Sequence, residues 1–247
     1  TKNLSFEYNE KPIIKDLSTL ITCGDKIGII GPNGSGKTTL IKLLLGELKP
    51  TEGSVRRGTK LKAVYFDQLR EQIRGDLSII ENICGDRKTI VVNGRPINVY
   101  SYLQDFLFTP DESRKPANTL SGGEKNRLLL AKLFQHPVNL IVMDEPTNDL
   151  DTETLELLEE VIASFKGTLL LVSHDRTFLN NVVQSTLVFE GNGIVREVAG
   201  GYDDYITQQR NLKLTPRLTK KQKPKTTEKP KGPEKLTYKE KLLLESL

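Results

Sequence analysis

The sequence is poor in the residues that mark disulfide-bonded, metal-binding and membrane-spanning proteins. Among its 247 residues there are two cysteines, Cys23 and Cys84, and two histidines. The cysteines have no paired spacing with other cysteines or histidines, so we expect ordinary reduced thiols rather than disulfide partners or metal ligands. No apolar run approaches the ~18 residues that a membrane-spanning helix requires. These absences favour a cytoplasmic protein that would reach a membrane only through another chain.

The sequence also lacks a leader at its start, where Thr1 runs directly into a stretch expected to form the first strand. Its single methionine is Met143. Removal of an initiator methionine before Thr1 is one explanation. A strand so close to the first residue favours instead a fragment of a longer protein.

Positive charge is concentrated in the last part of the chain. Residues 211–247 hold 11 Lys and Arg against 4 Asp and Glu, whereas residues 1–210 hold 25 against 28. Lys220–Pro233 combines Lys, Pro and Gly with almost no apolar residue, so it has little surface to bury and is expected to be disordered. A solvated linker and a segment that binds RNA or DNA phosphates both fit this composition.

Short apolar runs alternate with helical patterns from the start to about residue 204, which indicates an α/β fold. Several runs are unbroken enough to be buried on both faces, as the strands of a parallel sheet are. The predicted strands are 26–30, 61–66, 139–143, 168–172 and 185–189, and the predicted helices are 36–47, 121–136, 152–165 and 175–182. We expect this folded part to cover residues 1–205. A basic linker over 206–235 would follow, and then the start of a truncated helix or coiled coil over 236–247, where Thr237 and Glu240 form a capping-box pattern.

The segment from about Leu77 to Asn118 differs from its surroundings. Val91–Arg95 contains an Asn-Gly turn signal that is typical of a β-hairpin. An aromatic stripe that includes Tyr102 and Phe106 follows on a predicted helix. We interpret the stripe as the packing of a small, mostly helical lobe at about 77–136 rather than as a surface that stacks on bases.

A glycine-rich turn, Gly31-Pro-Asn-Gly-Ser-Gly-Lys37-Thr38, lies between the strand 26–30 and the helix 36–47. In this context its backbone N–H groups and the helix N-terminus are expected to form a binding site for phosphate oxygens. Lys37 would reach the β- and γ-phosphates of a nucleotide, and Thr38 would offer its hydroxyl to Mg²⁺. The alternative is a tight turn without a ligand.

Two carboxylates follow the apolar run Leu140–Met143. A parallel strand that ends there delivers Asp144 to the edge of the sheet where ligands bind. Asp144 fits a partner of Mg²⁺, and Glu145 could polarise the water that attacks a γ-phosphate. Because the pair Asp-Glu is common, this interpretation rests on its position after the phosphate loop and after the turn described next.

A second turn that could bind an anion is Leu120–Glu124, at the start of the predicted helix 121–136. Ser121 is a good N-cap residue, and Gly122 and Gly123 keep side chains away from the backbone N–H groups. A single bound nucleotide does not need two such anion-binding turns from one chain. The two turns are therefore expected to face different nucleotides. The pattern therefore predicts a head-to-tail pair of such units.

These motifs occur in the order found in ATP-binding cassette proteins, which the sequence resembles over nearly its whole length. The motifs are Gly31–Thr38, Gln68, Leu120–Glu124, Asp144-Glu145, Asn148–Asp151 and His174. Ser121–Phe134 and Asp144–Asp151 look more like the soluble ABC-F subfamily than like transporter cassettes. The resemblance implies a P-loop NTPase cassette with a mostly parallel core sheet, an antiparallel N-terminal β part and a small helical subdomain. It also implies that a first cassette, the linker between cassettes and most of a C-terminal coiled coil lie outside this sequence.

The resemblance implies roles for individual residues. Tyr8 corresponds to the aromatic residue that stacks on adenine, with a half-buried strand tyrosine as the alternative. Gln68 corresponds to the glutamine that senses Mg²⁺ and the attacking water, with a surface amide as the alternative. His174 corresponds to the histidine that bonds the γ-phosphate and holds Glu145 in line, although a lone histidine is more often structural. The loop 148–151 corresponds to the one that crosses the dimer interface, with a helix cap at its last residue as the alternative.

The candidate residues form three groups. The catalytic group is Lys37, Gln68, Glu145 and His174. The metal-binding group is Thr38, Gln68 and Asp144. The group that contacts the nucleotide is Tyr8, Gly31, Pro32, Asn33, Gly34, Ser35, Gly36, Lys37, Thr38, Thr39, Ser121, Gly122 and Gly123.

The expected function is Mg²⁺-dependent ATP binding and hydrolysis at a composite site between two cassettes. By resemblance, this would be a switch that acts on a ribosome or on DNA, through missing regions and the basic tail. The alternative is the nucleotide-binding subunit of an ABC membrane transporter, docked on a separate membrane subunit. A third interpretation is an interaction scaffold that binds ATP without using it.

Overall fold

The computed structural model describes residues 1–66, 72–85, 87–92 and 94–214. The chain divides into a compact unit, Thr1–Gln209, and a second unit that begins at Arg210. Of the second unit, only residues 210–214 are described. None of the helices in the described ranges combines the length and the apolar character needed to cross a membrane.

A six-stranded sheet runs through the compact unit in the order β11-β10-β3-β9-β8-β5. Its strands are β3 (Lys26–Ile30), β5 (Ala63–Tyr65), β8 (Leu140–Asp144), β9 (Thr168–Val172), β10 (Ser185–Gly191) and β11 (Ile194–Ala199). Neighbouring strands pair in parallel, except that β11 runs antiparallel to β10. Every residue of β3 and β9 is buried, as in sheets that are covered on both faces. The mostly parallel core sheet predicted from the sequence is confirmed.

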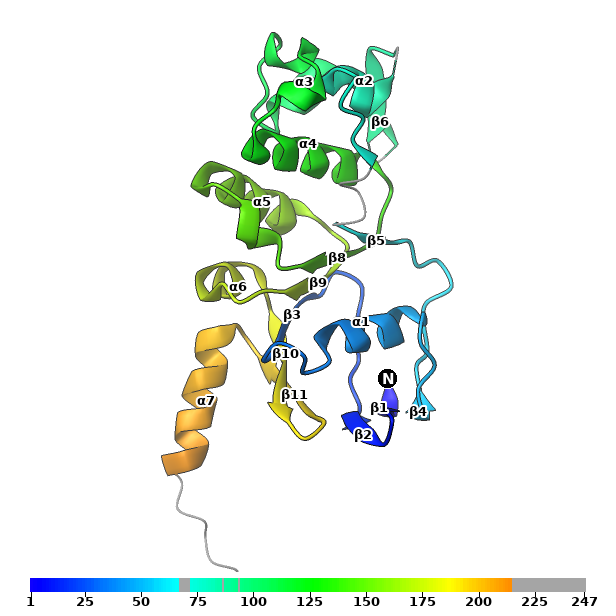
Figure 1. Ribbon diagram of the computed structural model, residues 1–247, viewed down its shortest axis with the longest axis vertical. Coiled ribbons are helices and arrows are strands. Elements are labelled where there is room, and N and C mark those ends of the chain that lie inside the picture. Colours follow the sequence, from blue (N-terminus) through cyan, green and yellow to red (C-terminus); the bar gives the residue numbers. More distant parts are fainter. Residues whose placement is uncertain (67–71, 86, 93, 215–247) are drawn as a thin grey trace, which may run out of the picture. The chain divides into compact units, whose positions relative to one another are not determined.

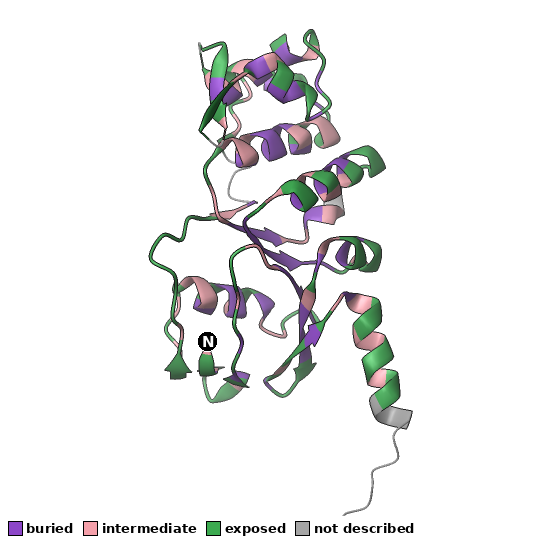
Figure 2. Ribbon diagram, turned by 180° about the vertical axis from the view of Figure 1, so that it is seen from behind, coloured by how far each residue is buried: buried purple, intermediate pink, exposed green. Residues whose placement is uncertain are grey.

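Two hydrophobic cores cover the two faces of this sheet. Along β9, Leu169 and Leu171 join one core, and Leu170 and Val172 join the other, as the period of two in a strand requires. The helix α1 (Lys37–Leu45) packs into the second core, whereas α5 (Thr152–Ser164) and α6 (Arg176–Val182) pack into the first. Figure 1 shows α1 on one side of the strands and α5 and α6 on the other, and Figure 2 shows the buried strands between them.

A smaller antiparallel sheet in the order β2-β1-β4 completes the second core. Its strands are β1 (Lys2–Tyr8), β2 (Lys11–Leu17) and β4 (Glu52–Ser54). The antiparallel N-terminal β part implied by the family resemblance is therefore confirmed.

A mostly helical lobe extends the first core at one end of the unit (Figure 1). It holds α2 (Ile79–Cys84), the antiparallel strands β6 (Thr89–Val92) and β7 (Arg95–Asn98), α3 (Val99–Gln104), two short 3₁₀ helices at Glu112–Arg114 and Ala117–Thr119, and α4 (Gly122–Gln135). The aromatic stripe packs inward, because Tyr102 and Phe106 are buried with their ring centres 5.1 Å apart. The hydroxyl of Tyr102 donates to the carbonyl of Ala131 on α4 at 2.6 Å. The packing interpretation of these aromatic residues is confirmed.

The predicted helices correspond to α1, α4, α5 and α6, each within two residues of its expected bounds. The helix α7 (Tyr202–Leu214) was not predicted, because its polar sequence carries little apolar periodicity. It continues through residues 206–214, which the sequence assigned to the beginning of the linker. The rest of the predicted linker and the helix over 236–247 lie outside the described residues.

Lys26, the first residue of β3, is buried with only 6% of its surface exposed. Its Nζ donates to the carbonyls of Phe165 at 2.7 Å and Gly167 at 2.5 Å, just beyond the end of α5. The ammonium also lies 4.8 Å from the centre of the Phe165 ring. Burial lowers the pKa of Lys26, while carbonyl groups at a helix C-terminus favour its charged form. This side chain ties the end of α5 to the edge of the central sheet.

We expect Lys26→Met to lower the free energy of unfolding by about 1–3 kcal/mol, because the substitution leaves two carbonyl groups without their donor. Lys166→Met is the matched control, since Lys166 lies between the two acceptor residues, Phe165 and Gly167, but is itself exposed. It should change stability by less than about 0.5 kcal/mol. Urea unfolding of both variants makes the comparison, and equal effects would contradict the role of Lys26.

Candidate functional site

The glycine-rich loop 31–38 connects β3 to α1, as the sequence predicted. Gly34 has φ +76° and Gly36 has φ +109°, in the left-handed region that favours glycine. A Cβ on Gly36 would lie 2.3 Å from Cγ2 of Ile13, and a Cβ on Gly31 would lie 2.7 Å from Cβ of Phe189. Backbone conformation and close packing therefore both require glycines in this loop.

Lys37 is buried and its ammonium turns back over the loop. Its Nζ donates to the carbonyl of Gly31 at 2.8 Å and lies 3.5 Å from Oδ1 of Asn33. The hydroxyl of Ser35 is buried and has no hydrogen-bond partner in the described part of the chain. A buried hydroxyl without a partner is costly, so this loop fits an anion that would accept its hydrogen bond.

Asp144 ends β8 opposite Val172 of β9. Its carboxylate lies close enough to the hydroxyl of Thr38 and to the ammonium of Lys37 for both groups to favour its charged form. Burial, followed by the charge of Glu145, raises the pKa of Asp144, although Lys37 and Thr38 act in the opposite direction. A cation beside Asp144 would favour its ionised form, and the carboxylate and hydroxyl oxygens are ligand types that Mg²⁺ prefers.

No group of three or more His, Cys, Asp or Glu side chains that could hold a metal ion occurs among the residues whose placement is described. Mg²⁺ is commonly bound through one or two carboxylates together with the phosphates of a substrate. The pair of Thr38 and Asp144 fits that kind of shared site.

Glu145 follows the strand in a strained backbone conformation, with φ +51° and ψ +51°. Its backbone N–H donates to the carbonyl of Val172 at 2.8 Å, and its Oε2 accepts the backbone N–H of His174 at 3.1 Å. The other carboxylate oxygen, Oε1, is buried, has no hydrogen-bond partner among the described residues and lies 3.4 Å from Nε2 of His174. That Nε2 also lies 3.2 Å from Oδ1 of Asn33. Strand pairing thus fixes Glu145 and His174 against the loop.

The turn before α4 forms a capping box. Ser121 Oγ accepts the backbone N–H of Glu124 at 3.2 Å, and the backbone N–H of Ser121 donates to Oε2 of Glu124 at 2.7 Å. The hydrogen bonds that the backbone N–H and the side chain of Ser121 make to the carboxylate lower the pKa of Glu124. The N–H groups of Gly122 and Gly123 lie in the first turn of α4, where a helix supplies no acceptor. A Cβ on Gly122 would meet no atom within 4 Å, so this turn is accessible to a ligand.

Gly123 packs directly against the start of α5. A Cβ on Gly123 would lie 2.2 Å from Oδ2 of Asp151. Asp151 is the N-cap of α5, since its Oδ1 accepts the backbone N–H of Thr154 at 2.8 Å. Interactions with the side chain and the backbone N–H of Thr154 lower the pKa of Asp151. The helix-cap interpretation of Asp151 is confirmed, and the cap also touches the turn before α4.

The structure brings part of the predicted set together. Six residues meet at the edge of the sheet where β3, β8 and β9 end: Asn33, Lys37, Thr38, Asp144, Glu145 and His174. The Ser121 turn, in contrast, begins α4. Figure 1 shows α4 farther from α1 than α5 is. Tyr8 is 48% exposed and contacts the ring of Phe6 at a centre distance of 4.8 Å. Gln68 and the side chain of Asp149 lie outside the described residues.

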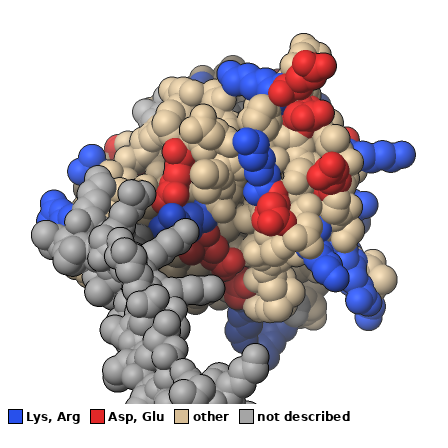
Figure 3. All heavy atoms as spheres, turned by 90° about the horizontal axis from the view of Figure 1, so that it is seen from below, with Lys and Arg blue, Asp and Glu red and all other residues tan. Residues whose placement is uncertain are grey.

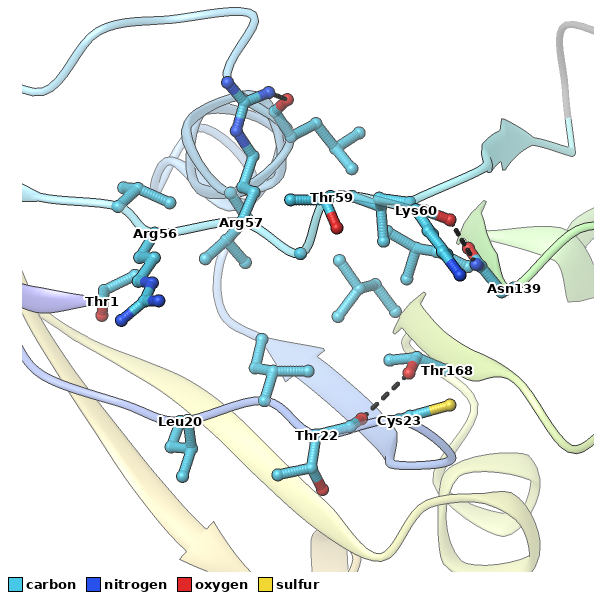
Figure 4. Close-up of a pocket in the computed structure, with 18 residues that line it drawn as sticks. Thr1, Leu20, Thr22, Cys23, Arg56, Arg57, Thr59, Lys60, Asn139 and Thr168 are labelled. Atoms are coloured by element: carbon cyan, nitrogen blue, oxygen red, sulfur yellow. Dashed lines mark hydrogen bonds between the residues drawn. The ribbon is translucent and has the colours of Figure 1, made fainter.

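Sequence patterns gave no signal for a cavity of about 450 Å³ at the opposite edge, where β8 and β9 begin. Its walls include the apolar side chains of Leu44, Leu140 and Leu170. In Figure 4, Arg56 and Lys60 stand at the rim, while Arg57 turns away to hydrogen-bond the carbonyl of Leu45. The cavity and the predicted phosphate site therefore lie at different ends of the parallel strands.

Comparison with known proteins finds one matching family model and several similar sequences. The family model described as ABC transporter matches residues 14–148. The chain is 46% identical over 260 residues to the ATP-binding protein Uup of Haemophilus influenzae, covering 100% of the chain and 40% of that protein. It is 51% identical over 208 residues to Uup of Escherichia coli, covering 84% of the chain and 33% of that protein. The chain therefore spans less than half the length of these two relatives.

Two solved structures have a similar fold. One is cbiO1 from Clostridium perfringens, part of the ABC transporter complex cbiONQ. Its TM-score is 0.62 at 21% identity, over 86% of the chain and 91% of that structure. The other is a dimeric, post-hydrolysis ATP-binding cassette bound to ADP and Pi. Its TM-score is 0.56 at 22% identity, over 80% of the chain and 97% of that structure. At these identities the likeness shows the fold alone.

The contact between Gly123 and Asp151 predicts different effects of alanine at two adjacent glycines. Gly123→Ala should lower the free energy of unfolding by about 0.5–2 kcal/mol, because its Cβ displaces Asp151 from the cap of α5. Gly122→Ala should leave stability unchanged or slightly raised, because its Cβ enters open space and alanine favours a helix. Denaturant unfolding measures both variants. The same stability for both would show that Asp151 does not depend on the space at Gly123.

Proposed function

The chain belongs to the ATP-binding cassette family, and from this premise we propose that it binds ATP with Mg²⁺ and hydrolyses it at a site completed by a second cassette. The matches to Uup support the ABC-F subfamily in particular. The observation that carries the proposal is the meeting of Lys37, Glu145 and His174 at one edge of the parallel sheet. Phosphoryl transfer to water requires a loop that holds the phosphates, a residue that orients the attacking water, and hydrogen-bond donors to the transferred phosphate.

Binding would use the loop and its lysine. Lys37 would exchange the carbonyl of Gly31 for oxygens of the β- and γ-phosphates, and the buried hydroxyl of Ser35 would gain an acceptor. Thr38 and Asp144 would hold Mg²⁺, together with Gln68. Mg²⁺ at this position would neutralise charge on the phosphate oxygens. On the exposed face of β1, Tyr8 would pack on the adenine.

Hydrolysis would depend on Glu145 and His174. Within the described ranges the buried oxygen Oε1 of Glu145 has no hydrogen bond, so it can accept one from a water molecule and orient that water toward the γ-phosphate. The backbone N–H of Glu145 donates to Val172, and its carboxylate accepts the backbone N–H of His174. These two hydrogen bonds hold Glu145 in place in spite of its strained backbone. His174 would donate a hydrogen bond to the γ-phosphate and keep it in line with the water.

The second cassette would contribute its own Ser121 turn. In a single chain this turn begins α4, beyond α5 from the phosphate loop (Figure 1), so we assign it to the nucleotide of the opposing cassette. The N–H groups of Gly122 and Gly123 and the hydroxyl of Ser121 would then close over that nucleotide. ATP would hold the two cassettes together and its hydrolysis would release them, which makes a two-state switch.

We propose that this switch acts on a ribosome or on nucleic acid, through the basic tail and through regions outside this chain. On the face seen in Figure 3, Lys and Arg side chains are interspersed with Asp and Glu, which favours the tail as the source of positive charge. Co-sedimentation with ribosomes, or salt-sensitive binding to branched DNA, would support this target. Copurification with a membrane subunit would support the transporter alternative instead.

Glu145→Gln should retain ATP binding and reduce ATP turnover by about a hundredfold or more, because the amide cannot accept a proton from water. The measurement compares nucleotide binding with phosphate release, for two cassettes paired in one sample. Unchanged hydrolysis would remove Glu145 from the catalytic role. Retained cellular function without hydrolysis would favour the scaffold interpretation.

Turnover per chain should rise with protein concentration, because each site needs the Ser121 turn of another cassette. The isolated chain should bind ATP modestly and hydrolyse it slowly. Phosphate release measured across a dilution series, with the oligomeric state followed in parallel, tests this expectation. Fast hydrolysis by a strictly monomeric sample would rule out the composite site.

A further inference from the structure

The side chain of Asn33 lies at the centre of a small network that joins the phosphate loop to Glu145. Its Oδ1 lies 3.5 Å from Nζ of Lys37 and 3.2 Å from Nε2 of His174. The same Nε2 lies 3.4 Å from Oε1 of Glu145. Asn33 itself is exposed, and a Cβ on the neighbouring Gly34 would meet nothing within 4 Å. An amide oxygen therefore faces two nitrogen donors, on an open side of the loop.

This arrangement determines which ring nitrogen of His174 carries a proton. A lysine ammonium only donates hydrogen bonds, so the Asn33 atom that faces Lys37 must be the oxygen. Nε2 of His174 then faces two acceptors, the oxygen of Asn33 and Oε1 of Glu145. A lone pair on Nε2 would be repelled by both oxygens, whereas an N–H on Nε2 would donate to Oδ1 of Asn33. The geometry points to an imidazole that carries a proton on Nε2.

We propose that Asn33 is a positioning residue that holds His174 as the Nε2–H tautomer before ATP binds. This inference rests on the proposed function, in which Lys37 and His174 both donate to the γ-phosphate. Without nucleotide, the two donors converge on the oxygen of Asn33. When ATP binds, phosphate oxygens take the place of Oδ1 as the acceptor. His174 then offers an N–H without first having to exchange its proton with solvent.

The tautomer can be measured without nucleotide. The chain contains two histidines, His136 and His174, so ¹⁵N chemical shifts assign both rings, and His136 serves as an internal reference. The full 247-residue chain is studied at a pH that keeps both imidazoles neutral. In the unsubstituted chain, Nε2 of His174 should show the shift of a protonated nitrogen. In Asn33→Ala, the Nδ1–H form should become populated while His136 is unchanged.

Two further variants separate positioning from folding. Asn33→Asp restores an acceptor oxygen, so the Nε2–H tautomer should return, but the added negative charge should raise KM for ATP by about tenfold or more. Asn33→Ala should lower kcat by about tenfold and change KM less than about twofold. Asn181→Ala is the matched control, since that exposed asparagine bonds Glu159 on α5. It should alter neither the tautomer nor the kinetics.

The spectra and the kinetics test different statements. An unchanged His174 tautomer in Asn33→Ala would overturn the inference whatever the activity. A tautomer that follows the side chain at position 33, in a chain that neither binds nor hydrolyses ATP, would support the positioning contact but contradict the proposed function. Equal losses of kcat in Asn33→Ala and Asn33→Asp, with the tautomer unchanged in both, would indicate a purely structural asparagine.

Discussion

The register between β8 and β9 is the constraint on which the candidate site depends. Asp144 pairs with Val172, and the next residue, Glu145, donates its backbone N–H to the carbonyl of Val172. Because β8 and β9 are parallel, both strands end at the same edge of the sheet. His174 follows Val172, the last residue of β9, by two residues. A slip of one residue would reverse the faces to which the side chains of β8 point and would change the separation of Glu145 and His174. The register of β8 and β9 therefore sets the distance between Glu145 and His174.

The segment 144–151 connects this edge to the helical lobe. It leaves β8 at Asp144, passes through a 3₁₀ helix at Pro146–Asp149 and ends at the N-cap Asp151. Asp151 touches Gly123 at the start of α4, and Arg127 on α4 pairs with Glu153 on α5 at 3.1 Å. The turn before α4 thus shares contacts with the chain that follows the carboxylates. In the proposed function, a change at one nucleotide would reach the turn that faces the other through this segment.

The two ends of the parallel strands differ in chemistry. The edge where the strands end carries the glycine-rich loop, a strained Glu145, and buried polar atoms that have no hydrogen-bond partner in the part of the chain that the structure describes. The edge where they begin carries an apolar cavity with Arg56 and Lys60 at its rim. Unsatisfied polar groups and strain are costly to fold, so they mark the first edge as the place where a ligand would contribute to stability.

The sequence alone was sufficient to predict the helices and strands that bury apolar side chains in a regular pattern, such as β3, β9 and α5. It also predicted the glycine-rich loop and the capping role of Ser121, because these depend on neighbouring residues. It did not predict α7, whose residues are mostly polar, nor the packing of Asp151 against Gly123. It could not predict that Asn33 meets His174, since the two residues are far apart in the chain and only the pairing of β3 with β9 brings them together. The sequence therefore determined the local turns and helix caps, which depend on neighbouring residues. The order and register of the strands decided which distant residues meet in the candidate site.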